Sequence, residues 1–289
     1  MKKIIFGLVI ITCFGCITFV ACKKVSLPNK TVSASESSQQ LVSQLKSINV
    51  INTIHKGGAK HKYQKAFADV GGALVGAVEW SWAGPIAATI GGVVTGGLAS
   101  GAVMIKNPSS PSYNQTWQVD ASFNNNNPYE QVGIRHNNLM IYLINNNDVN
   151  ANTSTEDIIS ISNSFLKNNY YTNENSNEFD NIAYSSNVSS TKINEIIADG
   201  NNSDWVNIYH NKINEAYNSS KISENTKNIL NIFLDNILVY NQNTEVSSYC
   251  NQFLDYINSS QNVLNDSEKA LICTEVTITK YSFTLNNSN

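Results

Sequence analysis

Apolar residues recur at intervals of three and four through most of the chain after residue 127, and this spacing predicts a series of amphipathic helices. The clearest segment starts at Ser223-Glu224 and places Ile229, Ile232 and Ile237 on one face. Gly200 is expected to end the helix of residues 190–199 as a C-cap. The pattern predicts an all-α bundle of about six helices over residues 128–289. The other helix starts are expected at Asn127-Pro128, Ser154, Ser190, Ser203, Thr244 and Asp266, most of them with a capping residue or first-turn acids.

Three further segments have less regular patterns. Residues 37–50 place Leu41, Leu45 and Ile48 on one face, and we expect a short amphipathic helix there. Residues 266–285 begin with helical spacing, although residues 276–279 alternate as a strand does; we predict a helix. Residues 23–36 are polar and rich in serine, which is typical of a tether.

The stretch from Trp80 to Ile105 contains no charged residue. Residues 83–105 would form a helix about 34 Å long, enough to cross a hydrocarbon core about 30 Å thick. Residues 66–78 form a second apolar arm, and the segment from Trp80 to Pro85 predicts a turn between them. The pattern therefore predicts a helical hairpin preceded by a cationic lead-in.

Small residues recur every four positions on both arms of this predicted hairpin. Such stripes allow two helix backbones to approach closely, as in helix pairs within membranes. Tryptophan at the turn is typical of a membrane interface. The residues expected to pack the helices or to contact a membrane are Gly72, Gly76, Trp80, Trp82, Ala88, Gly92, Gly96, Gly97, Ser100 and Gly101.

We predict that this hairpin associates with a membrane, and two alternatives remain open: a permeabilising toxin, and a surface interaction module whose hairpin only packs its core. The arms could contact a bilayer, with anionic lipid attracted by the lysines of the lead-in and with copies associating through the glycine stripe. They could instead pack as a soluble hairpin on the bundle, because glycine and alanine are frequent and Glu79 lies near the turn. The cationic lead-in with its GxxxG-rich hairpin resembles membrane-permeabilising bacteriocins. The lysines concerned are Lys56, Lys60, Lys62 and Lys65.

The first residues have the pattern of a secretory signal, with Lys2 and Lys3 followed by an uncharged, mostly apolar run to Ala21. Phe19-Val20-Ala21-Cys22 resembles the lipobox of bacterial lipoproteins, which implies cleavage before Cys22 and its acylation. We expect an exported protein that an acyl (palmitate-type) anchor at Cys22 holds on the outer membrane, on a face that the sequence leaves open. The alternatives are an uncleaved N-terminal membrane helix and a signal that is cut at another position.

Composition changes sharply near residue 107. Eleven of the fifteen glycines lie between Gly57 and Gly101, whereas 41 of the 44 asparagines lie at or after Asn107. Residues 22–106 carry nine Lys and three acids, and the remainder carries eight Lys or Arg and nineteen acids, which disfavours nucleic acid as a partner of the second half. The expected organisation is a signal peptide (1–21), a lipidated tether (22–54), the cationic lead-in and glycine-rich hairpin (55–106), an Asn/Pro-rich linker (107–127) and an acidic helical domain (128–289).

Two cysteines besides the anchor lie in the exported part, Cys250 and Cys273. An oxidising compartment permits a disulfide between them. Each could equally be a small buried apolar residue. Without nearby histidines they do not form a zinc site.

No arrangement typical of an enzyme is present in the sequence. The four histidines are His55, His61, His136 and His210, and their spacing matches no metal-binding or catalytic motif. Carboxylates are scattered singly. We expect a non-enzymatic protein that uses no cofactor and no metal.

A wider resemblance rests on Asn127-Pro128-Tyr129, Gly133 and His136-Asn137, together with residues 264–269. In these features the chain resembles uncharacterised Bacteroidota-type lipoproteins and secreted proteins, in which a glycine-rich segment precedes a helix of this kind. The resemblance implies an architecture and no particular activity.

Overall fold

In the computed structural model, every described residue belongs to the second of two units, Ala34–Asn289, which is called the compact unit below. Residues 1–33 therefore lie outside the described part, including the predicted signal, the lipobox and Cys22. The described residues are 34–48, 64–106, 116–119, 121, 123–146, 148–173, 175–237, 243–260 and 262–288.

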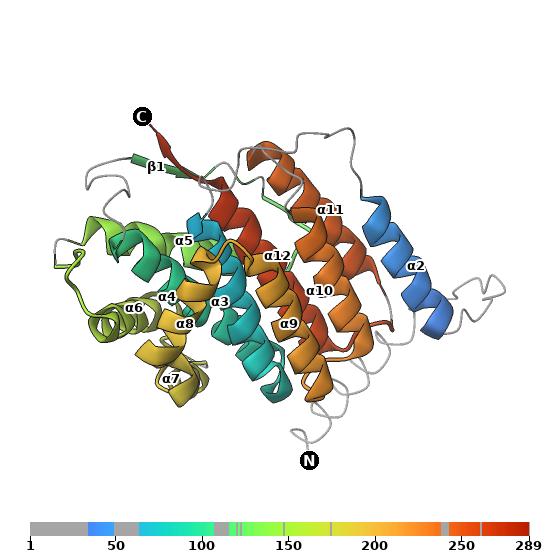
Figure 1. The fold of residues 1–289 in the computed structure, drawn as a ribbon, viewed down its shortest axis with the longest axis horizontal. Coiled ribbons are helices and arrows are strands. Elements are labelled where there is room, and N and C mark those ends of the chain that lie inside the picture. Colours follow the sequence, from blue (N-terminus) through green and yellow to red (C-terminus); the bar gives the residue numbers. More distant parts are fainter. Residues whose placement is uncertain are drawn as a thin grey trace, which may run out of the picture. The chain divides into compact units, whose positions relative to one another are not determined.

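The described part is almost entirely helical (Figure 1), which confirms the predicted all-α class. Amphipathic segments with polar outer faces form most of these helices, as their spacing predicts. In chain order the elements are α2 (Ala34–Ser47), α3 (Gln64–Trp80), η1 (Ser81–Ala83), α4 (Pro85–Lys106), β1 (Thr116–Val119), α5 (Glu130–Asn145), α6 (Thr155–Tyr170), α7 (Ser176–Ala183), η2 (Ser186–Val188), α8 (Ser190–Asn201), α9 (Trp205–Asn218), α10 (Glu224–Ile237), α11 (Asn243–Ser259), α12 (Asp266–Thr284) and β2 (Leu285–Ser288).

β1 and β2 form a short antiparallel pair, which the sequence did not predict. Thr116 pairs with Ser288 and Val119 with Leu285. β1 lies within the predicted linker, so part of that segment is a strand. No local turn signals this pairing, because the two strands lie far apart in the sequence.

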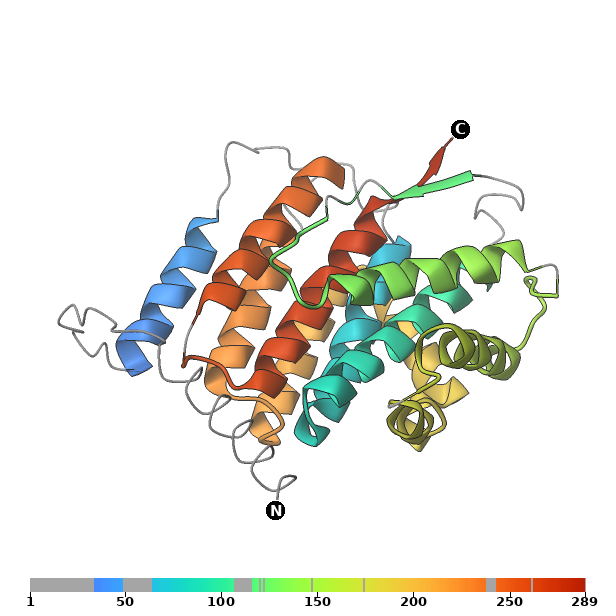
Figure 2. The same ribbon diagram turned by 180° about the vertical axis from the view of Figure 1, so that it is seen from behind.

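α4 lies at the centre of the compact unit. It packs against α3, α5, α6, α7, α8 and α12, and Figure 2 shows α12 and α5 against it from behind. Among the described residues α4 is the one helix long and apolar enough to cross a bilayer, and 94% of its apolar window is buried inside the protein. The charge-free run is therefore the core of this unit.

The helices before and after the predicted linker share their hydrophobic contacts. One cluster joins α2, α3, α9, α10, α11 and α12, with Phe233, Tyr249 and Phe253 at its centre. A second cluster joins α4 to α5, α6, α7 and α8 and includes Ala73 of α3 and Ile278 of α12. The break in composition near residue 107 therefore does not mark a boundary between two compact units.

Several helix boundaries follow the capping signals, and two do not. Ser154 accepts a hydrogen bond from the Asp157 amide and Ser223 from the Thr226 amide, as N-caps do. α5 begins at Glu130, three residues after the predicted cap Asn127, whose side-chain oxygen accepts a hydrogen bond from the Tyr129 amide and whose side-chain amide donates to Thr277. Gly200 is not a C-cap: α8 runs through it.

Gly200 has a packing role instead. A Cβ at this position would lie 2.9 Å from the Cα of Ala68, so the absent side chain lets α8 approach the backbone of α3. Residues 276–279 are helical within α12, as predicted. Their β-branched side chains are buried on every side of this helix, which explains why the sequence pattern there is not that of an amphipathic helix.

α2 is the predicted short amphipathic helix. Leu41, Leu45 and Ile48 are all buried, and the helix packs against α10 and α11. The Ser38 hydroxyl donates a hydrogen bond of 2.5 Å to the side-chain oxygen of Asn225, at the start of α10. α2 therefore belongs to the compact unit.

Candidate functional site

The backbones of α3 and α4 come into direct contact at the predicted small residues. A Cβ at Gly72 would lie 2.8 Å from the Cα of Gly96. A Cβ at Gly76 would overlap the carbonyl oxygen of Gly91. Side chains at these positions would force the helices apart, so the four-residue spacing has the packing effect expected of it.

The remaining small residues of α4 face other helices of the same chain. Gly97 leaves room for Leu139 and Gly101 for Leu143, both on α5, with the hypothetical Cβ atoms only 2.7 and 2.5 Å from the leucine methyl groups. Gly92 faces Thr274 of α12. Ala88 and Ser100 are also buried. In this conformation the glycine stripe is thus covered by the protein's own helices.

The turn between α3 and α4 is the exposed end of this helix pair. Trp80 is half-buried and stacks on Trp82, with 6.4 Å between ring centroids. Trp82 is 76% exposed, and Ile86, one turn into α4, is 49% exposed. Gly84 has φ = 117°, a backbone conformation that favours glycine and reverses the chain.

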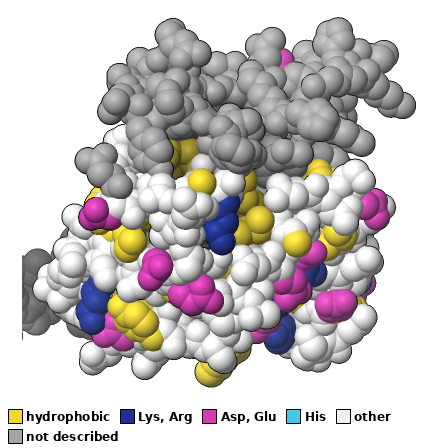
Figure 3. All heavy atoms as spheres, turned by 60° about the vertical axis from the view of Figure 1, so that its left-hand side comes forward, with side chains coloured by type: hydrophobic (Ala, Val, Ile, Leu, Met, Phe, Trp, Pro, Cys, Tyr) yellow, Lys and Arg dark blue, Asp and Glu magenta, His cyan; other side chains and the backbone are white. Residues whose placement is uncertain are grey.

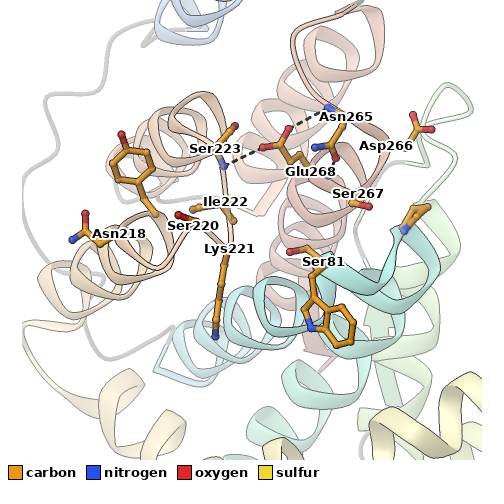
Figure 4. Close-up of a pocket in the computed structure, with 13 residues that line it drawn as sticks. Ser81, Asn218, Ser220, Lys221, Ile222, Ser223, Asn265, Asp266, Ser267 and Glu268 are labelled. Atoms are coloured by element: carbon orange, nitrogen blue, oxygen red, sulfur yellow. Dashed lines mark hydrogen bonds between the residues drawn. The ribbon is translucent and has the colours of Figure 1, made fainter.

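A shallow pocket of about 1010 Å³ opens beside this turn (Figure 4). Three helices begin around it: α4, α10 and α12. Glu268 caps the starts of α10 and α12, because its carboxylate accepts hydrogen bonds of 3.1 Å from the backbone amides of Ser223 and Asn265. The Asn-x-x-Glu spacing at residues 265–268 is a capping-box signal that could have predicted this arrangement.

Three charged groups near the pocket, on Lys221, Glu79 and Glu268, are already engaged. Lys221 forms an ion pair with both oxygens of Glu79, at 2.8 Å. Glu79, at the end of α3, therefore carries no free charge toward the turn. With the amide donors also occupied by Glu268, we find no unused cationic group here that would bind an anion.

A second feature is a buried polar cluster between α3, α5 and α12. His136 of α5 is fully buried, and its Nε2 lies 3.3 Å from Oδ1 of Asp69 on α3. Its Nδ1 lies 3.1 Å from the side-chain oxygen of Asn137. Burial lowers the pKa of His136, but the nearby Asp69 carboxylate and these hydrogen bonds outweigh burial and raise the pKa above its ordinary value.

Glu275 of α12 is the most strongly perturbed acid of this cluster. Its side chain is fully buried and accepts one long hydrogen bond, 3.4 Å from Thr279. Burial raises the pKa of Glu275 well above its ordinary value, and the charge of Asp69 adds to this shift. The folded protein therefore favours the protonated form of Glu275 over a wider pH range than the unfolded chain does.

A third set of buried polar groups lies farther along α12. Lys280 is fully buried and forms an ion pair with Glu130 of α5, which also accepts a hydrogen bond from the Tyr281 hydroxyl at 3.0 Å. Asn251 of α11 accepts a further hydrogen bond from Lys280 at 3.0 Å. These bonds join α5, α11 and α12 through satisfied polar contacts.

The polar residues of the second cluster lie in the interior of the described part of the chain. Asp69, His136 and Glu275 are at most 3% exposed. The sequence pattern does not single out Asp69 and Glu275, because each occupies an apolar face by spacing while being polar by type. Asp69 is the one that the sequence could have revealed, since it interrupts the apolar run of residues 66–78.

Cys250 and Cys273 are free thiols, and the disulfide that the sequence left open is not formed. Both are fully buried, and burial raises the pKa of Cys273 to about 12. They therefore pack as small apolar residues with little thiolate character.

Some predicted residues cannot be placed. Cys22, with Phe19, Val20 and Ala21, lies outside the described part, as do three lysines of the lead-in; Lys65 is placed only as a residue of α3. In the described ranges, no three His, Cys, Asp or Glu side chains are grouped so as to hold a metal.

On the face seen in Figure 3, apolar side chains lie as separate small patches among uncharged polar surface, with charges of both signs between them. This agrees with a polar outer face on the surrounding helices. Comparison with protein-family models, with curated proteins and with solved structures finds no match to the chain.

Proposed function

We propose that this protein is an exported, non-enzymatic lipoprotein of the cell envelope, held by an acyl anchor at Cys22 on the outer membrane, whose helical body presents an interaction surface. In this proposal the glycine-rich helix pair is the packing core of that body. The observation that carries the proposal is the burial of α4, 94% of whose apolar window is already covered by the chain itself. Beyond its exposed first turn, α4 is covered by other helices of the chain and offers no apolar face to the acyl chains of a bilayer.

The lipid anchor is tested by mass spectrometry of the N-terminal peptide from the protein isolated from membranes. We expect cleavage before Cys22 and acyl groups on that cysteine. The variant Cys22→Ala should appear in the soluble fraction. A soluble wild-type product that begins at another residue contradicts the anchor.

A second candidate function is membrane permeabilisation, favoured by the length and composition of α4. This activity requires α4 to leave its six neighbouring helices. We expect the full-length mature chain to leave dye-loaded anionic vesicles intact under conditions where its circular dichroism shows the native fold. Leakage by the folded protein would favour the second candidate.

A further inference from the structure

The turn between α3 and α4 concentrates exposed apolar surface. Of the five large apolar side chains exposed in the described residues, Trp82 and Ile86 lie four positions apart, and Ala83 and Pro85 between them are exposed as well. The other three, Phe123, Tyr142 and Tyr184, lie on separate elements. Exposed apolar groups gathered in this way mark a contact surface. We refer to Trp82, Ala83, Pro85 and Ile86 as the turn patch.

The chemistry of the turn patch favours an uncharged, interfacial partner. No residue from Trp80 to Ile105 is charged. The nearest charge, Glu79, is neutralised by Lys221. The neighbouring pocket wall carries Asp266 and Glu268, so the patch has no attraction for anionic lipid. Tryptophan with an aliphatic neighbour is the composition that partitions to the boundary of headgroups and acyl chains.

The chain enters the compact unit at the same end as the turn patch. Ser38, in the second turn of α2, hydrogen-bonds Asn225, and Asn225 donates to the carbonyl of Val263 at 3.3 Å. Ser223, two residues from Asn225, lines the pocket beside Trp82. In Figures 1 and 2 the first turn of α2 and the α3–α4 turn lie at one end, opposite the C-terminus.

The covalent distance from the proposed anchor is short. Twelve peptide units separate Cys22 from Ala34, the first residue of α2. Even a fully extended chain of this length spans at most about 40 Å. An acyl chain on Cys22 therefore keeps the first turn of α2 within about 40 Å of the bilayer, which raises the effective concentration of the turn patch there.

We propose that the turn patch is a second membrane contact, in which Trp82 and Ile86 enter the headgroup–acyl boundary of uncharged phospholipid while α4 stays in the core. The contact rests on the proposed lipid anchor for its orientation. It orients the body with the α3–α4 turn toward the membrane and the β1–β2 end away from it.

Fluorescence quenching on anchored protein tests this contact. The chain from Cys22 to Asn289 is coupled through Cys22 to a maleimide lipid, and the buried Cys250 and Cys273 do not react. In phosphatidylcholine vesicles with brominated acyl chains, we expect tryptophan emission to be quenched. The variant Trp82→Phe, which keeps an apolar ring, should lower the quenched component relative to the parent, in which Trp80 and Trp117 also emit and Trp205 is buried.

Vesicle binding without the anchor gives the matched comparison. With Cys22→Ser in place, Trp82→Ser with Ile86→Ser should lower partitioning into phosphatidylcholine vesicles about tenfold, because two large apolar groups no longer leave water. The control variant Phe123→Ser with Tyr184→Ser removes side chains that are 53% and 61% exposed elsewhere, and it should bind as the parent does. Circular dichroism verifies that each variant is folded.

The outcomes separate the two proposals. Absence of quenching in the anchored wild type, or equal binding by the turn variant and the control, overturns the membrane contact. The membrane contact is also overturned if the turn substitutions change the molar mass of the protein in solution but not its binding to vesicles. In that case the turn patch contacts a second copy of the chain. Quenching that persists while protein from cells carries no acyl group on Cys22 supports the contact and contradicts the natural anchor.

Discussion

Protonation of two buried residues links the stability of the fold to pH. Glu275 has a folded-state pKa well above its ordinary value of 4.5, so its contribution to stability is present near and below pH 4.5 and is lost as pH rises toward the folded-state pKa. His136 has a pKa raised above 6.5, so its ion pair with Asp69 stabilises below pH 6.5 and is lost as pH rises through the raised value. Both residues therefore act in the same direction.

We expect the unfolding free energy to fall as pH rises from 5 to 8. One proton bound only by the folded state gives a slope of about 1.4 kcal/mol per pH unit. Urea unfolding at a series of pH values measures it. Glu275→Gln removes one of the two contributions and should flatten the profile, raising stability at pH 8 relative to the parent. A parent protein that becomes more stable from pH 5 to pH 8 would contradict this assignment.

Among the helical elements, the contact between α3 and α4 is the one most sensitive to a single methyl group. Gly76→Ala places a Cβ against the backbone carbonyl of Gly91, which cannot rotate away. We expect a loss of about 2–3 kcal/mol, at the upper end of overpacking effects. Gly101→Ala is the matched control, because its Cβ meets a methyl group of Leu143 that can move.

The control should be close to neutral, since alanine stabilises a helix interior by about 1 kcal/mol relative to glycine. Chemical denaturation of both variants measures the difference. Equal destabilisation by the two substitutions would show that the contact of Gly76 with the backbone of Gly91 tolerates a methyl group as well as the contact of Gly101 with Leu143 does.

Sequence patterns predicted the helices but not which helices pack against one another. The spacing of Leu41 and Leu45 in α2 predicted which face is buried, because an amphipathic surface helix has one apolar side. The same reasoning fails for α4 and α12, which are buried all round and have no distinguishing face. Their partners depend on contacts between distant segments, such as Gly92 with Thr274, that no local pattern contains.

The candidate site was predictable to a similar extent. The four-residue spacing correctly identified Gly72 and Gly76 as close-packing positions. It could not tell whether the partner surface is lipid or protein, because both accept the same small residues. The buried pair of Asp69 and His136 was not anticipated, since its members lie on helices that only the folded chain brings together.

At the scale of the whole molecule, the shared core predicts that residues 107–289 do not fold as the native bundle alone. In this fragment α5 and α12 lose α3 and α4, which leaves Leu139, Leu143 and Thr274 without their partners. We expect the fragment to unfold without a cooperative transition, while residues 34–289 unfold cooperatively. Thermal melts followed by circular dichroism compare the two. A sharp transition of the fragment, at the temperature of the longer chain, would show that the helix pair is dispensable.

The orientation of the anchored body gives the last prediction. α9 runs from Trp205 to Asn218, and its fourteen residues span about 21 Å. Asn218 lines the pocket at the turn end, whereas Ser203 precedes the opposite end of the helix. A dye at Asn218→Cys should therefore transfer energy to an acceptor in the bilayer more efficiently than a dye at Ser203→Cys. In the proposed mature chain, acylation of Cys22 and burial of Cys250 and Cys273 would leave the introduced thiol as the reactive one. Both positions are exposed, so neither label disturbs the core. Equal transfer from the two positions would mean that the anchored body takes no fixed orientation, and stronger transfer from residue 203 would place the opposite end against the membrane.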